Sequence, residues 1–164
     1  IAEEAKRGHT VAIHSASHKY NQIYTSEQAF FDDLEQMNSI IKAQTGNDAS
    51  IIRFPGGSSN TVSKDYCPGI MTQLVNDVTA RGLLYCDWNV SSGDANSKPI
   101  STEQVVHNVI SGVQSHNVSV VLQHDIKDFS VNAVEQIIQW GQANGYTFLP
   151  LTTSSPMSHH RVNN

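Results

Sequence analysis

The sequence has few charged residues and no cluster of lysine and arginine. Only 15% of its 164 residues are charged, and 15 aspartates and glutamates outnumber 10 lysines and arginines, so the net charge is −5. A surface that binds nucleic acid needs basic side chains gathered together, because they must neutralise a phosphate backbone. The composition therefore argues against nucleic acid as a partner.

Long apolar runs are also absent. No stretch approaches the ~20 apolar residues that cross a bilayer, and residues 1–9 have neither the charged nor the apolar region of a signal peptide. We therefore expect contact with a membrane only through an anchor upstream of Ile1. Residue 1 is not methionine, and residues 1–8 are typical of a helix that ends at Gly8, so we expect an N-terminally incomplete single domain over residues 1–164.

Cysteine is rare as well, and the sequence contains only Cys67 and Cys86. These residues could form one disulfide in an exported protein, or they could be separate buried thiols. The sequence leaves both alternatives open.

Short apolar runs rich in β-branched residues alternate with longer segments of helical spacing. The predicted strands cover residues 9–13, 50–53, 83–90 and 118–122. The predicted helices cover residues 26–46, 69–81, 102–115 and 131–143. Because regular alternation of this kind produces parallel strands covered by helices, we expect an α/β fold, either an open sheet or a barrel.

A polar segment follows each predicted strand. The segments are HSASH at 14–18, RFPGGSSN at 53–60, WNVSSGD at 88–94 and QHD at 123–125. In parallel α/β folds the active site lies at the carboxyl ends of the strands. We therefore expect these segments to converge on one face.

His14 and His18 are spaced i, i+4 directly after a strand, which can bring two imidazoles to one metal ion. The alternative is a pair of exposed loop histidines. A catalytic zinc ion usually has three protein ligands, often including a carboxylate, so the pair is incomplete by itself. Asp32 and Asp33 could supply a carboxylate, but they lie within a predicted amphipathic helix, and we interpret both as its solvated side.

Arg53 ends a predicted strand, so its guanidinium is placed to bind a carboxylate at the rim of a site. A surface arginine is the alternative. No Lys-Ser or Lys-Thr pair follows Gly56 and Gly57, which argues against a phosphate-binding P-loop. The glycines instead allow backbone N–H groups to approach a ligand.

His124, at the end of a predicted strand, resembles a general acid or base; a buried structural histidine is the alternative. Asp87 and Asp94 flank Trp88, and they could orient catalytic side chains or belong to turns. We expect the other histidines to lie away from the site. His107 and His116 are expected on the surface, and His159 and His160 in a flexible tail.

Taken together, HSASH, RFPGG, WNVSSGDA and VVLQHD resemble in order and spacing the motifs of the polysaccharide deacetylase family, also called the NodB-homology family or carbohydrate esterase family four. HSASH is similar to the zinc motif H-[ST]-x-x-H, RFPGG to R-x-P-x-G, and LQH to L-x-H. The ending FLPLTTSSPMSHHRVNN resembles that of the peptidoglycan N-acetylglucosamine deacetylase branch. The resemblance covers essentially the whole chain.

The resemblance implies a distorted (β/α) barrel that acts outside the cell or at its surface. The implied reaction is hydrolysis of the acetamide of N-acetylglucosamine residues in peptidoglycan, with Zn²⁺ or another divalent transition metal as cofactor. Chitin oligomers, acetylated xylan and a non-catalytic carbohydrate-binding domain are the alternatives. The family's T-F-D-D-G-type motif, which carries the catalytic base and a carboxylate ligand, is absent, so we expect it and the first strand upstream of Ile1.

By this resemblance, His14 and His18 would bind the metal. Arg53 would orient the catalytic base. A backbone N–H near Gly56 would share the developing oxyanion with the metal.

The resemblance also assigns roles near the third and fourth segments. Asp94 would hold His124, which would protonate the departing amine. Leu122 would line the pocket for the acetyl methyl group. The family's fourth motif usually reads D-x-x-D-W, whereas Ala95 follows Asp94 here, so Trp88 is the candidate substitute for the pocket wall.

Overall fold

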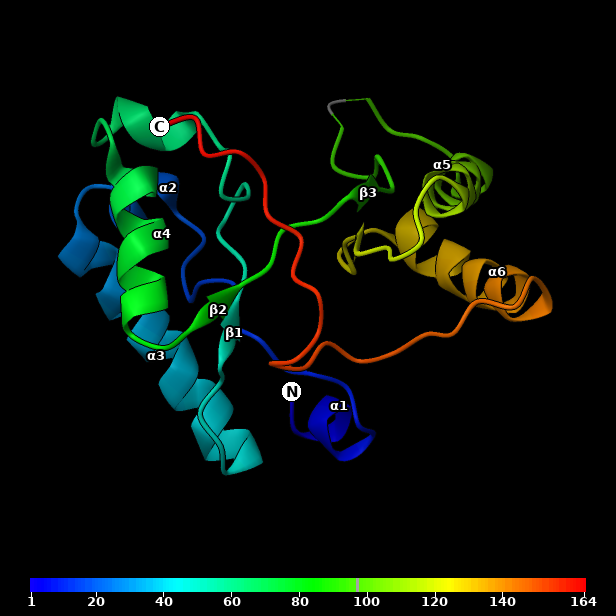
Figure 1. Ribbon diagram of the computed structural model, residues 1–164, viewed down its shortest axis with the longest axis horizontal. Coiled ribbons are helices and arrows are strands. Elements are labelled where there is room, and N and C mark those ends of the chain that lie inside the picture. The colour runs from blue at the N-terminus through cyan, green and yellow to red at the C-terminus, as the bar shows by residue number, and fades with distance from the viewer. Residues whose placement is uncertain (97) are drawn as a thin grey trace. The chain divides into compact units, whose positions relative to one another are not determined.

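The computed structural model describes residues 1–96 and 98–164. Its elements in chain order are α1 (Ala2–Lys6), α2 (Tyr20–Ile23), α3 (Glu27–Thr45), β1 (Ile51–Ile52), the 3₁₀ helix η1 (Val62–Asp65), α4 (Ile70–Ala80), β2 (Leu84–Tyr85), β3 (Val90–Ser91), α5 (Thr102–Gln114), β4 (Val121–Leu122) and α6 (Asp128–Ala143) (Figure 1). The chain divides into two compact units. Unit 1 comprises Ile1–Asp87 with Pro150–Asn164, and unit 2 comprises Trp88–Leu149.

Unit 1 contains a small parallel sheet. β1 pairs with β2 in the register Ile51 to Leu84 and Ile52 to Tyr85, and Ile13 bridges to Ile52 in the same direction. The isoleucines favour extended backbone because they are β-branched, and their side chains are buried in the core. The parallel pairing is as predicted.

The helices α3 and α4 pack against this sheet (Figure 1). α3 begins after Ser26, whose hydroxyl accepts a hydrogen bond from Ala29 N–H, and ends at Gly46, which has a φ of 80°. The buried apolar side chains of the two helices are Phe30, Phe31, Leu34, Ile41, Ile70, Met71, Leu74 and Val78. Because each such side chain stabilises the fold by about 1.5–3 kcal/mol when buried, this apolar face holds the helices in place.

The C-terminal segment, residues 150–164, packs onto unit 1. The His159 ring stacks on Tyr85 with the centroids 4.0 Å apart, and the carbonyl of Asn164 accepts a hydrogen bond from an amide in the first turn of α4. His160 is held by hydrogen bonds of its own. The prediction of a flexible histidine pair in the tail is therefore wrong, because these contacts join segments that are far apart in the sequence.

Unit 2 contains a second parallel pair and two helices. Val90 of β3 lies opposite Val121 of β4, and the same pairing places Ser91 opposite Leu122. α5 begins after Ser101, whose hydroxyl accepts from the amide three residues later. The buried contact between α5 and α6 is made by Val105, Val109, Ala133 and Ile137.

The helices agree with the prediction better than the strands do. α3, α4 and α5 match within one or two residues, whereas α6 begins three residues before the predicted start. The predicted strand 83–90 is divided into β2 and β3, which pair with β1 and β4 respectively. The short α2 and η1 were not predicted. The α/β class is confirmed, while the barrel and the single domain stay predictions.

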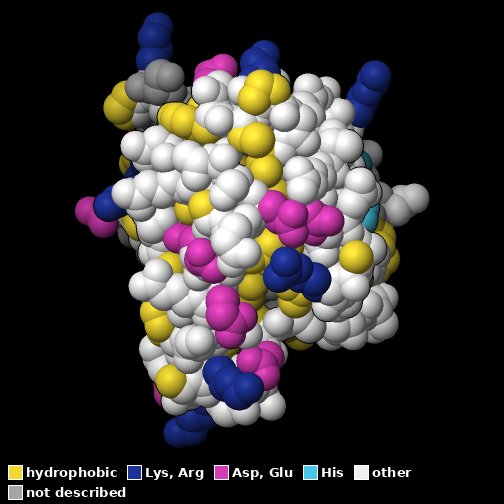
Figure 2. All heavy atoms as spheres, turned by 90° about the vertical axis from the view of Figure 1, so that its left-hand side faces the viewer, with side chains coloured by type: hydrophobic (Ala, Val, Ile, Leu, Met, Phe, Trp, Pro, Cys, Tyr) yellow, Lys and Arg dark blue, Asp and Glu magenta, His cyan; other side chains and the backbone are white. Residues whose placement is uncertain are grey.

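The structure also bears on disulfides, membranes and surface charge. Cys67 and Cys86 are free thiols. Among the described residues, no helix combines the length and the apolar character needed to cross a membrane. Figure 2 shows acidic and basic side chains interspersed on the face that carries α3 and α4, and in this view the described side chains form no continuous basic surface.

Gly112 lies where α5 packs against β3. A Cβ atom at this position would meet Val90 Cγ1 at 2.5 Å, and Val90 is buried and too short to move aside. We expect Gly112→Ala to lower the free energy of unfolding by about 1–3 kcal/mol, although alanine by itself favours a helix by about 1 kcal/mol. Urea unfolding followed by circular dichroism would measure the change. Ser111→Ala, an exposed control on the same helix, should stay within about 0.5 kcal/mol of wild type, and equal stability of both variants would contradict this packing.

Candidate active site

His14 lies where the chain leaves the sheet of unit 1. Arg53 N–H donates to Ile13 O (2.8 Å), which places the two segments side by side, and His14 Nδ1 lies 2.8 Å from Arg53 O. Because a carbonyl oxygen only accepts hydrogen bonds, Nδ1 carries the proton. In the neutral ring the lone pair therefore resides on Nε2, as in metal-binding histidines whose other nitrogen is held by a backbone carbonyl.

His18 lies at the other end of the HSASH segment, residues 14–18. The ring centroids of His14 and His18 are 5.1 Å apart, with their planes tilted by 56°. The segment turns sharply, since Ser15 and His18 have φ angles of 104° and 54°. His18 N–H donates to Ser15 Oγ (2.9 Å) inside this turn. The structure thus brings the two predicted metal ligands together.

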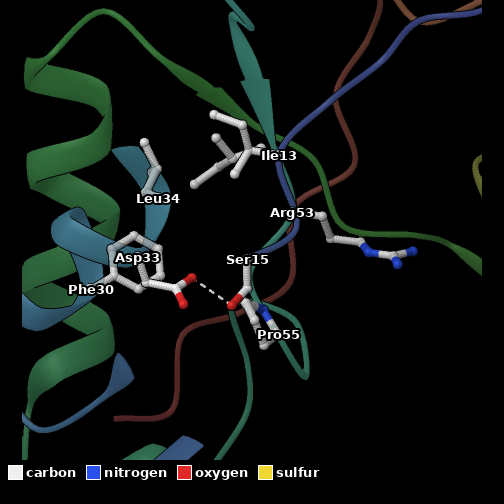
Figure 3. A pocket seen from close by; sticks show the side chains of 8 residues that line it. Ile13, Ser15, Phe30, Asp33, Leu34, Arg53 and Pro55 are labelled. Carbon is white, nitrogen blue, oxygen red and sulfur yellow. Dashed lines mark hydrogen bonds between the residues drawn. The ribbon is translucent and has the colours of Figure 1, made fainter. Parts of the chain in front are cut away.

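The carboxylate of Asp33, on α3, binds the HSASH segment. Its Oδ2 accepts from the Ser15 hydroxyl (2.5 Å) and Ala16 N–H (2.8 Å), and its Oδ1 accepts from Ser17 N–H (2.9 Å). Figure 3 shows the contact with Ser15. Burial raises the pKa of Asp33, but the hydrogen bonds from Ser15, Ser17 and Ala16 outweigh this effect and hold the pKa below its ordinary value. Asp33 is therefore ionised at neutral pH.

The prediction that Asp32 and Asp33 both lie on the solvated side of their helix is right for Asp32 and wrong for Asp33. Asp32 is exposed and accepts a hydrogen bond from Gln28 Nε2 (2.7 Å). Because successive residues advance by about 100° around a helix, Asp33 lies about 60° from the buried Phe30, whereas Asp32 lies about 160° from it. This angular position beside the apolar face is the signal that could have identified Asp33.

His14 and His18 fit two ligand positions of a zinc centre, because both offer imidazole nitrogens on one turn. Among the described residues, no group of three or more His, Cys, Asp or Glu side chains is arranged to hold a metal ion. Both carboxylate oxygens of Asp33 are engaged by the HSASH segment, so Asp33 does not supply a further ligand. The metal-binding roles of the two histidines stay predictions.

A small cavity lies beside the HSASH segment. It is lined by Ile13, Ser15, Phe30, Asp33, Leu34, Ile52, Arg53 and Pro55 (Figure 3). Its volume of about 10 Å³ has room for roughly one water molecule, so it does not accommodate a sugar. The guanidinium of Arg53 points away from the Asp33 carboxylate, so these side chains do not pair (Figure 3).

The segment that follows β1 forms a loop held by Asp87. The carboxylate of Asp87, which is 1% exposed, accepts from Ser58 N–H (2.8 Å), the Ser58 hydroxyl (2.5 Å) and His160 N–H (2.9 Å). Gly56 has a φ of 78°, and a Cβ atom there would lie 2.7 Å from the hydroxyl oxygen of Tyr20. The positive φ and this close contact favour glycine at this position, and Asp87 orients the loop that contains it.

In unit 2, Asp94 and His124 are in contact. His124 Nδ1 lies 2.8 Å from Asp94 Oδ1, while Asp94 Oδ2 accepts from His124 N–H (2.7 Å) and from the Ser130 hydroxyl (2.6 Å). The expected contact between the carboxylate and the histidine is confirmed. Ser130, which is buried near the start of α6, was missed because no local spacing links it to Asp94.

The environment of Asp94 keeps its carboxylate charged. Burial raises the pKa of Asp94, but the hydrogen bonds from Ser130 and His124 outweigh burial and lower the pKa to about 2. Asp94 is 2% exposed, whereas the side chain of His124 is 29% exposed. Because the carboxylate holds Nδ1–H, Nε2 is the nitrogen of His124 that can exchange a proton.

The structure shows where the other predicted site residues lie, while their roles stay predictions. Leu122 is buried in β4, and Trp88 is half-buried. His107 and His116 are exposed, as predicted. Within unit 1 the HSASH segment meets the loop after β1, and within unit 2 Asp94 meets His124; the expected convergence of all the polar segments stays a prediction.

The low pKa of Asp94 makes its contribution to stability dependent on pH. Aspartate in an unfolded chain has a pKa of about 3.9. Ionised Asp94 therefore stabilises the fold above this pH, and the stabilisation is lost as the pH falls towards the folded-state pKa of about 2. We expect Asp94→Asn to lower the free energy of unfolding by about 2 kcal/mol at pH 7 and to flatten its change between pH 4 and 2. Urea unfolding at several pH values would measure both effects. Asp125→Asn, an exposed neighbour, should keep the wild-type profile, and a wild-type profile in Asp94→Asn would show that the carboxylate is not needed.

Comparison with known proteins identifies the family of this chain. Residues 1–67 match the family model described as polysaccharide deacetylase. A curated peptidoglycan-N-acetylglucosamine deacetylase from Bacillus cereus is 28% identical over 152 residues, which cover 90% of this chain and 52% of the relative. The chain therefore spans about half the length of this relative.

Solved structures are similar over nearly the whole chain. The catalytic domain of a peptidoglycan N-acetylglucosamine deacetylase from Eubacterium rectale is 98% identical, with a TM-score of 0.98 over 99% of this chain and 74% of that chain. A family 4 carbohydrate esterase from Streptococcus mutans is 26% identical, with a TM-score of 0.74 over 91% of this chain and 66% of that chain. These similarities, together with the HSASH segment and the loop after β1, show that the chain belongs to the polysaccharide deacetylase family.

Proposed function

We propose that this protein hydrolyses the acetamide of N-acetylglucosamine residues in peptidoglycan and releases acetate. The observation that carries the proposal is the near identity of the chain to the Eubacterium rectale catalytic domain, a peptidoglycan N-acetylglucosamine deacetylase. The Bacillus cereus relative has the same activity. The paired imidazoles of unit 1 and the Asp94–His124 contact of unit 2 supply groups that this chemistry uses.

The proposed cofactor is Zn²⁺ or another divalent transition metal, held by His14 and His18. When bound by these residues, the ion would provide Lewis-acid chemistry toward the acetamide carbonyl. His14 would present Nε2 to it, because Arg53 O holds the Nδ1–H of the same ring. The His18 ring would bind the same ion, and the 5.1 Å between the two ring centroids supports this assignment.

The loop after β1 would stabilise the negative charge that develops on the acetamide oxygen. Gly56 is exposed and has no side chain, so its backbone N–H can approach this oxygen. Asp87 holds the loop through Ser58, and a donor that is already in place stabilises the transition state without reorganisation. Arg53, which points away from Asp33, would orient the carboxylate that acts as base (Figure 3).

His124 would deliver the proton that the departing amine needs when the C–N bond breaks. Asp94 holds the Nδ1–H of this ring, so Nε2 is the nitrogen that would face the amine. Leu122 would line the pocket for the acetyl methyl group, and Trp88 would form part of the pocket wall.

Membership of the family also supports two proposals about the whole protein. The fold of the whole domain would be the distorted (β/α) barrel of this family. Its substrate, a polysaccharide of the bacterial cell wall, would place the protein at the cell surface or outside the cell.

Acetate release by the zinc-loaded full-length protein tests the proposed function. We expect release from peptidoglycan to be faster than from chitin oligomers or acetylated xylan, and His14→Ala or His18→Ala to lose both zinc binding and activity, because each removes an imidazole ligand. Isothermal titration with zinc and an acetate assay would measure these effects. His107→Ala, which removes an exposed histidine of α5, should behave as wild type. Faster release from xylan, or full zinc affinity in either ligand variant, would contradict the proposal.

His124→Ala separates catalysis from metal binding. We expect kcat to fall by roughly 10²–10⁴, the usual contribution of a positioned acid, while zinc affinity stays close to that of wild type. The acetate assay at saturating zinc and the titration measure the two quantities on the same sample. Loss of zinc from this variant would identify His124 as a ligand, and full turnover would show that another group donates the proton.

A further inference from the structure

The HSASH segment adopts a conformation that its own residues disfavour. Ser15 and His18 have φ angles of 104° and 54°, in the region that residues with a side chain rarely adopt. Such backbone conformations persist only where surrounding contacts hold them. Because the positions of both imidazoles follow from this turn, whatever holds the turn also sets the distance between the rings.

The contacts that hold the turn come from outside the segment. At its first residue, His14 Nδ1 is bound to Arg53 O at the end of β1. Beyond that residue, Asp33 binds the Ser15 hydroxyl and the amides of Ala16 and Ser17. The bound Ser15 hydroxyl in turn accepts a hydrogen bond from the backbone N–H of His18, so a chain of hydrogen bonds runs from α3 to the backbone of the second histidine.

We propose that Asp33 is a positioning residue of the metal site: it holds the HSASH turn so that His14 and His18 face one ion before the ion binds. The inference rests on the proposed metal-binding function of these histidines. Asp33 acts through the turn and not as a ligand, because both of its oxygens are engaged by Ser15, Ala16 and Ser17.

The alternative explanation is that Asp33 only attracts the cation through its negative charge. Asp32 separates the two explanations, because it carries the same charge on the same helix, one residue away. It is exposed and binds Gln28 instead of the HSASH segment. Asp32→Asn therefore removes an equal charge and leaves the turn intact, while Asp33→Asn puts an NH₂ group or a neutral oxygen where an anion accepts hydrogen bonds.

Zinc affinity, measured by competition with a chelator on the intact protein, tests the proposal. We expect Asp33→Asn to weaken zinc binding by about 10–100-fold, the usual effect of losing a group that orients a ligand, and Asp32→Asn to change it by less than about twofold. Ser15→Ala, which cuts the link from Asp33 to His18 but keeps the amide contacts, should give an intermediate loss. Wild-type affinity in Asp33→Asn, or an equal loss in both aspartate variants, would overturn the proposal.

Amide hydrogen exchange in the metal-free protein tests the turn itself. We expect the amides of Ala16 and Ser17 to exchange at least about tenfold faster in Asp33→Asn, while the amides of α3 keep their protection. Unchanged exchange at these two amides would overturn the proposal. Failure of the wild type to bind zinc would contradict the proposed function, and the exchange rates would still decide whether Asp33 holds the turn.

Discussion

The candidate site depends on parallel pairing between very short strands. In unit 1, hydrogen bonds between Ile13 and β1 bring His14 beside the carbonyl of Arg53. In unit 2, the pairing of β3 with β4 brings the segments that carry Asp94 and His124 to the same end of the strands. Because parallel strands end at one edge of a sheet, each pairing joins two polar loops that are distant in the sequence.

Carboxylates then fix the loops that the strands bring together. Asp33 holds the HSASH turn, Asp87 holds the loop after β1, and Asp94 holds both the backbone and the ring of His124. In each case the partners include backbone N–H groups and a serine hydroxyl. A carboxylate accepts several charge-assisted hydrogen bonds, which are roughly twice as strong as neutral ones, and it is short, so it orders a loop efficiently. These serine hydroxyls, two from polar segments and one from α6, thus help to order the candidate functional residues within each unit.

The helices could be predicted because their signals are local. α3 lies between a serine cap and a terminal glycine, and its apolar residues recur at helical spacing, so neighbouring residues decide where it begins and ends. The residues at which a strand begins and ends depend instead on the neighbouring strand with which it pairs. The apolar run 83–90 contains both β2 and β3, and only the separate pairing of each with β1 and β4 shows where one ends and the other begins. The packing of residues 150–164 onto unit 1 could not be predicted either, because it also depends on contacts with distant segments.

For the candidate site, the sequence by itself determined which chemical groups are present and where spacing allows them to act together. It indicated the pair His14 and His18, and the resemblance to known motifs indicated the contact of Asp94 with His124. Only the tertiary structure decided which groups hold these residues in place. Asp33 reaches a turn 18 residues earlier in the chain, and Ser130 reaches a carboxylate 36 residues away. Such bonds require segments to approach within about 3 Å, and that approach follows from how helices and strands pack rather than from the identity of the bonded residues.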